Sequence, residues 1–133
     1  MIYLDTAAIV KLIRVEQESA ALVGWLNERS TQPLVASALV EIELPRALRR
    51  SQPEVLGLAA AVLSRLHRIE INAAVRATAA AYVEPTLRTL DAIHLATAEF
   101  LIASGKPLTA FVTYDKRLAD AATRVGLTVT SPA

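Results

Sequence analysis

The stretch Thr89-Leu-Asp-Ala-Ile-His-Leu-Ala-Thr-Ala-Glu99 predicts the opening of a buried amphipathic helix that runs to about Ser104. Thr89 is expected to be its N-cap, and Asp91 falls in the first turn, where the helix dipole favours a carboxylate. The apolar residues that follow continue at the spacing of a core-facing helix. Asp91 is therefore expected at the mouth of a helix whose body lies inside the protein.

Two other aspartates occupy similar places. Asp5 ends the apolar run that begins at Met1, and Asp115 ends the run 110–115. The chain has only four aspartates, so three of them lie where an apolar strand stops or a helix starts. Each one alone has a simpler structural explanation: Asp5 and Asp115 as helix caps, and Asp91 as a charge that complements the helix dipole. Together they suggest a group of carboxylates that meet in space.

The order of short apolar runs and helical segments indicates the fold. Strands are expected at 1–4, 33–37, 67–71, 108–114 and 127–130, and helices at 7–15, 20–28, 37–50, 51–66, 72–82, 89–104 and 116–125. This alternation favours an α/β fold with a mainly parallel central sheet covered on both faces. Ligands of such sheets bind beyond the carboxyl ends of strands, near a switch in strand order, and both Asp5 and Asp115 follow a strand.

Length and composition exclude several classes of protein. The chain has 133 residues, which predicts one domain over 1–133, with an aliphatic core because 53% of residues are hydrophobic and 5% aromatic. It has no cysteine, and so neither a disulfide nor a thiolate metal site. No apolar run approaches the ~18 residues that span a bilayer, and no signal-peptide pattern opens the chain, so a cytoplasmic protein without a membrane partner is expected. A net charge of +1 does not by itself indicate nucleic acid.

Carboxylates gathered at one edge of a sheet repel one another, and a divalent cation between them relieves that repulsion. An all-oxygen site suits Mg²⁺ or Mn²⁺ better than Zn²⁺. Such an ion can hold a phosphodiester oxygen, activate a water and stabilise the leaving oxygen. The helix at 37–50 offers a further acid, but spacing alone does not choose between Glu41 and Glu43.

Four blocks of the sequence resemble the PIN domain, and more narrowly the VapC toxins of VapBC toxin–antitoxin pairs. They are Tyr3-Leu-Asp-Thr-Ala-Ala8, the segment from Ser37 to Glu43-Leu-Pro-Arg-Ala-Leu-Arg-Arg50, Leu87-Arg-Thr-Leu-Asp-Ala-Ile-His-Leu-Ala-Thr-Ala98 and Val112-Thr-Tyr-Asp-Lys-Arg-Leu118. The resemblance covers essentially the whole chain. It implies a three-layer α/β/α PIN-like domain and a Mg²⁺-dependent endoribonuclease, with Mn²⁺ as a substitute, that cleaves RNA through a metal-activated water and inhibits translation and growth.

The resemblance also implies the residues of the site. The matching acids are Asp5, Glu43, Asp91 and Asp115. The Glu-Leu-Pro-Arg-Ala pattern prefers Glu43 over Glu41. Asp5 and Asp91 are expected to bind metal directly, while the other two bind it, position it through water or act as the base. Thr113 would add a hydroxyl, and the choice between one metal and two stays open.

An RNA substrate needs cations near this acidic pocket, because phosphate contacts dominate its affinity. Arg46 and Arg50 share a helical face with Glu43, and Lys116 directly follows Asp115. The alternative for each is an ordinary solvated helix face.

His94 lies one helical turn after Asp91. A proton shuttle or a metal ligand is one interpretation. The interpretation that we favour is a buried histidine hydrogen-bonded to a neighbour. Ala7 stands where the family commonly has Ser, and no acid of the pattern is missing.

The resemblance further implies partners: a VapB-type antitoxin, a second copy of the chain in a homodimer, and a larger hetero-oligomer with the antitoxin. The C-terminal segment of the antitoxin would lie in an apolar groove and reach an arginine or similar group into the acid pocket.

Two other classes of function stay open. A non-catalytic PIN-like interaction module is disfavoured by the presence of all four acids, and metal binding would distinguish it. A phosphoryl-transfer enzyme of the haloacid dehalogenase type also starts from a strand-ending Asp. That class needs a second Asp two residues later, where this chain has Ala7.

Overall fold

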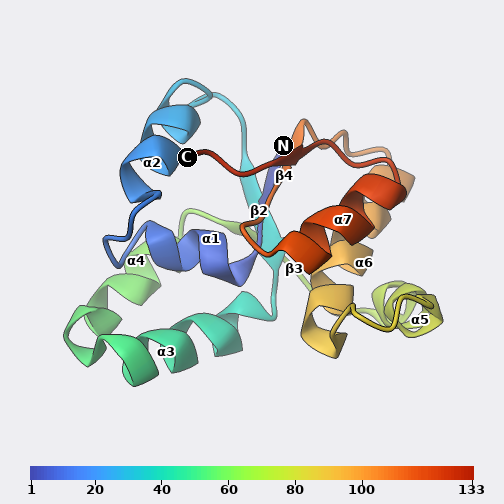
Figure 1. Ribbon diagram of the computed structural model, residues 1–133, viewed down its shortest axis with the longest axis horizontal. Helices are drawn as coiled ribbons and strands as arrows, with labels where there is room; N and C mark the ends of the chain where they lie inside the picture. Colours follow the sequence, from blue (N-terminus) through green and yellow to red (C-terminus); the bar gives the residue numbers. More distant parts are fainter.

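A five-stranded sheet lies between two groups of helices in the computed structural model, which describes residues 1–133 (Figure 1). The strands are β1 (Ile2–Leu4), β2 (Leu34–Ser37), β3 (His67–Ile69), β4 (Ala110–Val112) and β5 (Val129–Thr130). Their order across the sheet is β3-β2-β1-β4-β5, and every neighbouring pair is parallel. The predicted three-layer α/β/α fold is confirmed.

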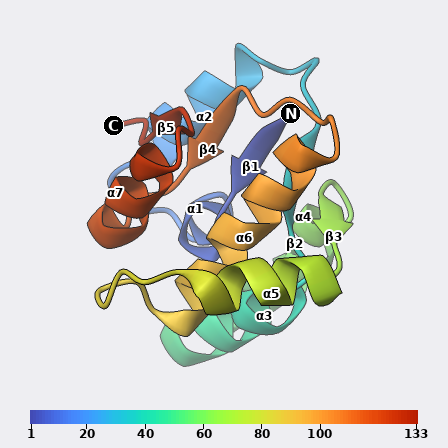
Figure 2. The same cartoon turned by 90° about the vertical axis from the view of Figure 1, so that its right-hand side faces the viewer.

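The helices divide between the two faces of the sheet. On one face lie α1 (Thr6–Lys11), α2 (Ser19–Asn27), α3 (Val40–Ser51), the 3₁₀ segment η1 (Pro53–Leu58) and α4 (Ala59–Leu63). On the other lie α5 (Ala73–Ala81), α6 (Thr89–Ala103) and α7 (Lys116–Arg124), which are in front of the sheet in Figure 2. Measured by length and hydropathy together, none of these helices could cross a membrane.

Alternation along the short strands supplies both halves of the core. Ile2 and Leu4 of β1 pack with the α1–α4 group, whereas Tyr3 between them packs with α6 and α7. Strand β4 repeats the pattern, with Phe111 on the second side stacked on Tyr3 at a centroid distance of 5.0 Å. Because successive side chains point to opposite faces, a strand of three residues is enough to hold both helical layers.

Strand order reverses between β1 and β4. The chain leaves β1 toward β2 and β3 on one side, and it leaves β4 toward β5 on the other. The register pairs Leu4 with Val112, so Asp5 follows β1 directly beside Thr113. Residues placed just after these two strands therefore lie at the switch point where open α/β sheets bind their ligands.

Two predicted helices on the first face are shorter or less regular than expected. Helix α1 ends at Lys11, before the predicted end at Val15, which is 90% exposed and has no packing to hold it in a helix. The predicted helix 51–66 is divided into η1 and α4, of which only Ala59 is buried. Ser37 was expected to cap α3, but Leu39 occupies the N-cap position. Ser37 lies two residues earlier, where its hydroxyl accepts a hydrogen bond from the Leu39 N–H at 3.1 Å.

The start of α6 also differs from the prediction. Thr89 is the first helical residue, and Arg88 takes the N-cap position with extended backbone (φ −74°, ψ 158°) and no capping bond from its side chain. Asp91 nevertheless lies in the first turn, where its charge complements the open N–H groups. The helix body is buried as predicted, with Leu95 and Ala96 in the interior.

Candidate active site

A cavity of about 830 Å³ lies at the switch point, and the four predicted acids, Asp5, Glu43, Asp91 and Asp115, all line it. Its walls come from α1 and α3 on one side and from the starts of α6 and α7 on the other (Figure 1). Each acid belongs to a different element, so the fold and not the local sequence brings them together.

Asp5 is the most deeply buried of the four, with an exposed fraction of 4%. It is the N-cap of α1, where its Oδ1 accepts a hydrogen bond from the Ala8 N–H at 2.9 Å. Its Oδ2 accepts from the Thr113 hydroxyl at 2.6 Å. Burial raises the pKa of Asp5 above its usual value, against the lowering effect of the Thr113 bond. The carboxylate thus caps a helix and belongs to the cavity.

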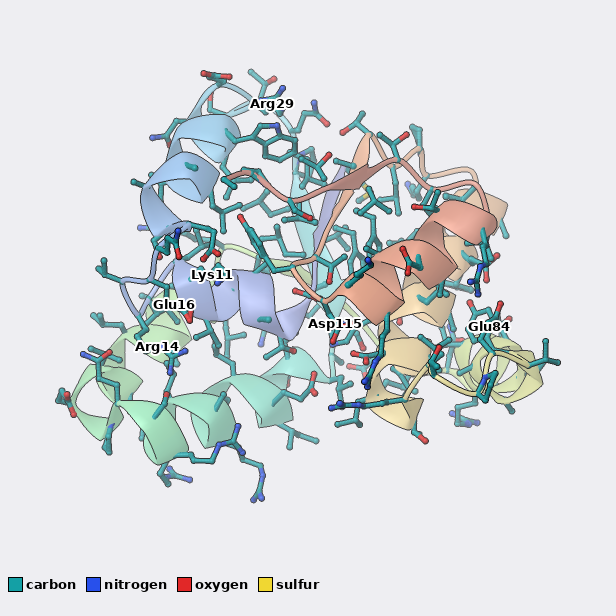
Figure 3. All side chains as sticks on the ribbon, viewed as in Figure 1. Lys11, Arg14, Glu16, Arg29, Glu84 and Asp115 are labelled. Atoms are coloured by element: carbon teal, nitrogen blue, oxygen red, sulfur yellow. The ribbon has the colours of Figure 1, made fainter.

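Thr113 joins Asp5 to Asp115. Its buried hydroxyl donates to Asp5 and accepts from the Asp115 N–H at 3.1 Å. Asp115 is the N-cap of α7, and its Oδ1 accepts from the Leu118 N–H at 3.0 Å. Figure 3 shows Asp115 at the start of this helix, near the middle of the molecule. The predicted hydroxyl of Thr113 is therefore part of the cavity's framework.

Asp91 is half-buried in the first turn of α6. Burial raises its pKa, and the nearby charges of Asp115, Asp5 and Glu43 raise it further, while His94 lowers it. The charges of the other three carboxylates therefore disfavour ionisation of Asp91.

Glu43, and not Glu41, faces the other acids from α3. Its Oε1 accepts from the Thr6 hydroxyl at 2.5 Å and lies 2.9 Å from His94 Nε2. Burial acts to raise the pKa of Glu43, but the bonds from His94 and Thr6 outweigh it and leave the pKa below its usual value. Glu41 is outside the cavity and pairs instead with Arg68 at 3.4 Å.

His94 is buried and hydrogen-bonded, in agreement with the interpretation favoured from the sequence. Its Nδ1 lies 2.8 Å from the Tyr3 hydroxyl. Sequence reasoning did not single out Tyr3 or Thr6. A signal existed for both, because Thr6 directly follows Asp5 and Tyr3 precedes it by the two-residue period of a strand.

Three arginines of the cavity wall form no ion pair: Arg46, Arg50 and Arg88. Two of them, Arg46 and Arg50, are the predicted neighbours of Glu43 on α3. Lys116, at the start of α7, is different, because it does not line the cavity.

The remaining cations of the wall are already paired. Lys11 Nζ contacts Glu18 at 2.9 Å and Glu16 at 3.3 Å, and Arg14 contacts Glu16 at 2.7 Å. Figure 3 shows Lys11, Arg14 and Glu16 together near the end of α1. These cations are neutralised by the loop after α1, so they are less available to an anionic ligand than the three arginines.

The donor set of the cavity fits a hard divalent cation. All four acids offer oxygen, and burial, together with the charge of neighbouring acids, raises the pKa of Asp5 and of Asp91, which a bound cation would counteract. No three acidic or histidine side chains are gathered closely enough to enclose an ion. The structure thus shows an acidic cavity without an assembled coordination sphere.

Known proteins share this fold and much of this sequence. The family model of the PIN domain matches residues 2–124. The chain is 55% identical over 132 residues to Ribonuclease VapC35 of Mycobacterium tuberculosis, with 99% of this chain and 97% of that protein covered.

Solved structures give the same architecture at low identity. FitAcB from Neisseria gonorrhoeae matches with a TM-score of 0.76 at 21% identity, covering 99% of this chain and 98% of that one. VapC20 of Mycobacterium tuberculosis, a sarcin-ricin loop cleaving toxin, matches with a TM-score of 0.74 at 18% identity, covering 99% and 100%. At these identities the likeness shows the fold alone.

Proposed function

The chain belongs to the PIN-domain family, and we propose that it is a Mg²⁺-dependent endoribonuclease, the VapC-type toxin of a type II toxin–antitoxin pair. The observation that carries the proposal is the meeting of Asp5, Glu43, Asp91 and Asp115 in one cavity at the switch point of the sheet. The 55% identity to a protein named as a ribonuclease supports the reaction class.

The acids have distinct parts in this proposal. Asp5 and Asp91 would hold the cation directly, and Glu43 and Asp115 would complete its site or orient water. When bound, Mg²⁺ supplies charge stabilisation at the phosphodiester and lowers the pKa of a water. The lowered pKa of Glu43 suits a ligand or orienting role, because a general base works best with a pKa near the operating pH.

RNA would bind through the wall of the cavity. Arg46, Arg50 and Arg88 are exposed and without ion pairs, so they are free to contact phosphates. Ile42 and Leu90 also line the cavity and are 61% and 48% exposed. They offer apolar surface to an unpaired base, which favours single-stranded RNA.

A VapB-type antitoxin is the partner that we propose, with the chain as a homodimer in a larger complex in the cytoplasm. An apolar pocket of about 300 Å³ between α2 and α4 supports this, lined by side chains that include Leu12, Leu26, Leu34, Val62 and Leu66. Cleavage of RNA by the free toxin would inhibit translation and growth.

The first experiment is cleavage of a total-RNA pool by the purified chain in Mg²⁺ or in EDTA. The variants Asp5→Ala and Asp91→Asn remove single acids of the cavity. Asp120→Asn is the matched control, because Asp120 is exposed on α7 and outside the cavity. We expect discrete fragments from the wild-type chain and from Asp120→Asn in Mg²⁺ only.

Cleavage that persists in EDTA or in Asp91→Asn would contradict the proposal. Binding of Mg²⁺ by calorimetry, without cleavage of any RNA pool, would instead support the non-catalytic interaction module.

A further inference from the structure

We propose, on the premise of the ribonuclease function above, that Tyr3 and His94 are positioning residues that tie down one carboxylate oxygen of Glu43 and leave the other for the cavity. Tyr3 is fully buried, and His94, although it lines the cavity, is only 2% exposed. They act through Glu43.

A row of hydrogen-bonding groups connects the sheet to Glu43. The Ser37 N–H, at the end of β2, donates to the Tyr3 hydroxyl at 3.2 Å. That hydroxyl lies 2.8 Å from His94 Nδ1, and His94 Nε2 lies 2.9 Å from Glu43 Oε1. The row crosses β2, β1, α6 and α3, so the position of Glu43 depends on the packing of both helical layers against the sheet.

With a neutral His94 ring, one tautomer satisfies the whole row. Glu43 accepts but does not donate when ionised, so the His94 Nε2 beside its Oε1 must carry a hydrogen. Nδ1 of the neutral ring is then an acceptor, and the Tyr3 hydroxyl donates to it. The Tyr3 oxygen keeps a lone pair for the Ser37 N–H. The opposite tautomer would turn the Tyr3 hydrogen away from His94 and set the Nε2 lone pair against the carboxylate.

Two donors thus converge on the same oxygen of Glu43. Thr6 donates to Oε1 at 2.5 Å and His94 donates to the same atom, while Oε2 receives no hydrogen bond. The carboxylate of Glu43 can rotate about its Cγ–Cδ bond. The hydrogen bonds from Thr6 and His94 hold Oε1 and so leave Oε2 for the cavity. Residues that hydrogen-bond a metal-binding side chain orient that side chain and adjust its basicity.

The test compares Tyr3→Phe with a matched control. Tyr3→Phe removes only the hydroxyl that selects the His94 tautomer. Tyr82→Phe makes the same change where the hydroxyl donates to Glu99, between α5 and α6 and outside the cavity. Nitrogen NMR of the metal-free protein reports the tautomer, and His67, the other histidine of the chain, is exposed and serves as an internal reference.

We expect wild type and Tyr82→Phe to carry the His94 hydrogen on Nε2, and Tyr3→Phe to show a mixture of tautomers. In Mg²⁺-dependent cleavage, Tyr3→Phe should lower kcat by roughly 10- to 100-fold, as for other groups that orient a ligand. KM should not change, because the arginines of the wall are untouched. A merely structural role of Tyr3 would leave both the tautomer and the kcat of the folded variant unchanged.

Two results would overturn the proposal: a wild-type His94 with its hydrogen on Nδ1, or a Tyr3→Phe variant with the kcat of wild type. If Tyr3→Phe shows no melting transition, His94→Gln and His94→Leu replace it. The Gln side chain keeps an N–H donor and should retain more kcat than Leu, and equal values would count against the role. A wild-type chain without Mg²⁺-dependent cleavage would refute the ribonuclease function itself, whereas the NMR result would still report the hydrogen-bond row.

Discussion

Single residues in this cavity combine structural and chemical roles. Asp5 and Asp115 were each explicable as helix caps, and both are caps, yet both also line the acidic cavity. The two interpretations are compatible because the carboxyl end of a strand is also where the next helix begins. Asp91 differs from them, because it lies in the first turn of α6 and makes no capping bond.

We predict that Asp91→Asn abolishes cleavage but stabilises the metal-free protein. The raised pKa means that burial and repulsion by the other acids outweigh the attraction of His94. Removing the charge should raise the free energy of unfolding in EDTA by up to about 1 kcal/mol, the size of a partly screened charge pair. Chemical denaturation in EDTA measures this difference.

The stability difference between wild type and Asp91→Asn should also depend on pH. The folded-state pKa of Asp91 is above its unfolded value, so the metal-free wild type gains stability as the pH falls through the folded pKa. The amide that replaces this carboxyl in the Asp91→Asn variant does not titrate. The advantage of the variant should therefore be largest at neutral pH and shrink toward about pH 4. A variant less stable than wild type at neutral pH would show that the dipole interaction dominates.

Thr113→Val should destabilise the fold and disturb two acids together. The substitution keeps the shape of the side chain but leaves the Asp115 N–H without its acceptor and Asp5 Oδ2 without its donor. Buried groups that lose a partner cost about 1–3 kcal/mol each, so we expect a loss of about 2–6 kcal/mol in denaturant unfolding. Thr123→Val is the control, because its hydroxyl bonds only a carbonyl of its own exposed helix turn. Equal losses in the two variants would contradict a special role of Thr113.

At the level of helices and strands, much could be predicted from the sequence. The positions of the strands could be predicted from short apolar runs. Asn72 could be predicted as a helix cap because its side chain can accept a hydrogen bond from a backbone N–H. Helix starts without a capping side chain could not be predicted in this way. Thr89 looks like a cap, but the chain turns at Arg88, and packing of the buried body of α6 sets the start.

Helix α7 provides a test that separates capping from chemistry. Asp115→Asn keeps a capping oxygen but removes the charge, so it should leave the melting temperature nearly unchanged and abolish cleavage. Asp115→Ala loses both, and its unfolding free energy should fall by about 1 kcal/mol.

The matched control for the cap is Asn72→Ala on α5. Its Oδ1 accepts from the Val75 N–H at 2.9 Å, almost as Asp115 accepts from Leu118 at 3.0 Å, but Asn72 is outside the cavity. Asn72→Ala should lose about the same stability and keep full cleavage. Cleavage by Asp115→Asn at the wild-type rate would mean that Asp115 is only a cap.

Across the whole molecule, the sequence predicted the layers but not every contact between them. Alternating strands and helices indicated a parallel sheet, and the acids that follow strands indicated the edge of the sheet where the cavity lies. The choice of Glu43 over Glu41 came from the family resemblance, because only the packing of α3 on α1 shows that Glu43 meets Thr6. The contact of Tyr3 with His94 joins β1 to α6, and no local pattern specifies such a pairing.

RNA binding should depend on the cavity arginines, although the net charge is only +1. In an Asp91→Asn background, which should bind RNA without cutting it, Arg50→Gln removes one cation of the cavity wall. We expect weaker binding of single-stranded RNA of any sequence, with the slope of log K against log salt reduced by about 0.7 for one phosphate contact. Arg49→Gln is the control, because Arg49 is the exposed neighbour of Arg50 on α3 but does not line the cavity. Fluorescence anisotropy over a salt series measures both slopes. If the two variants lose affinity equally, RNA is held by the general charge of α3 and not by the cavity wall.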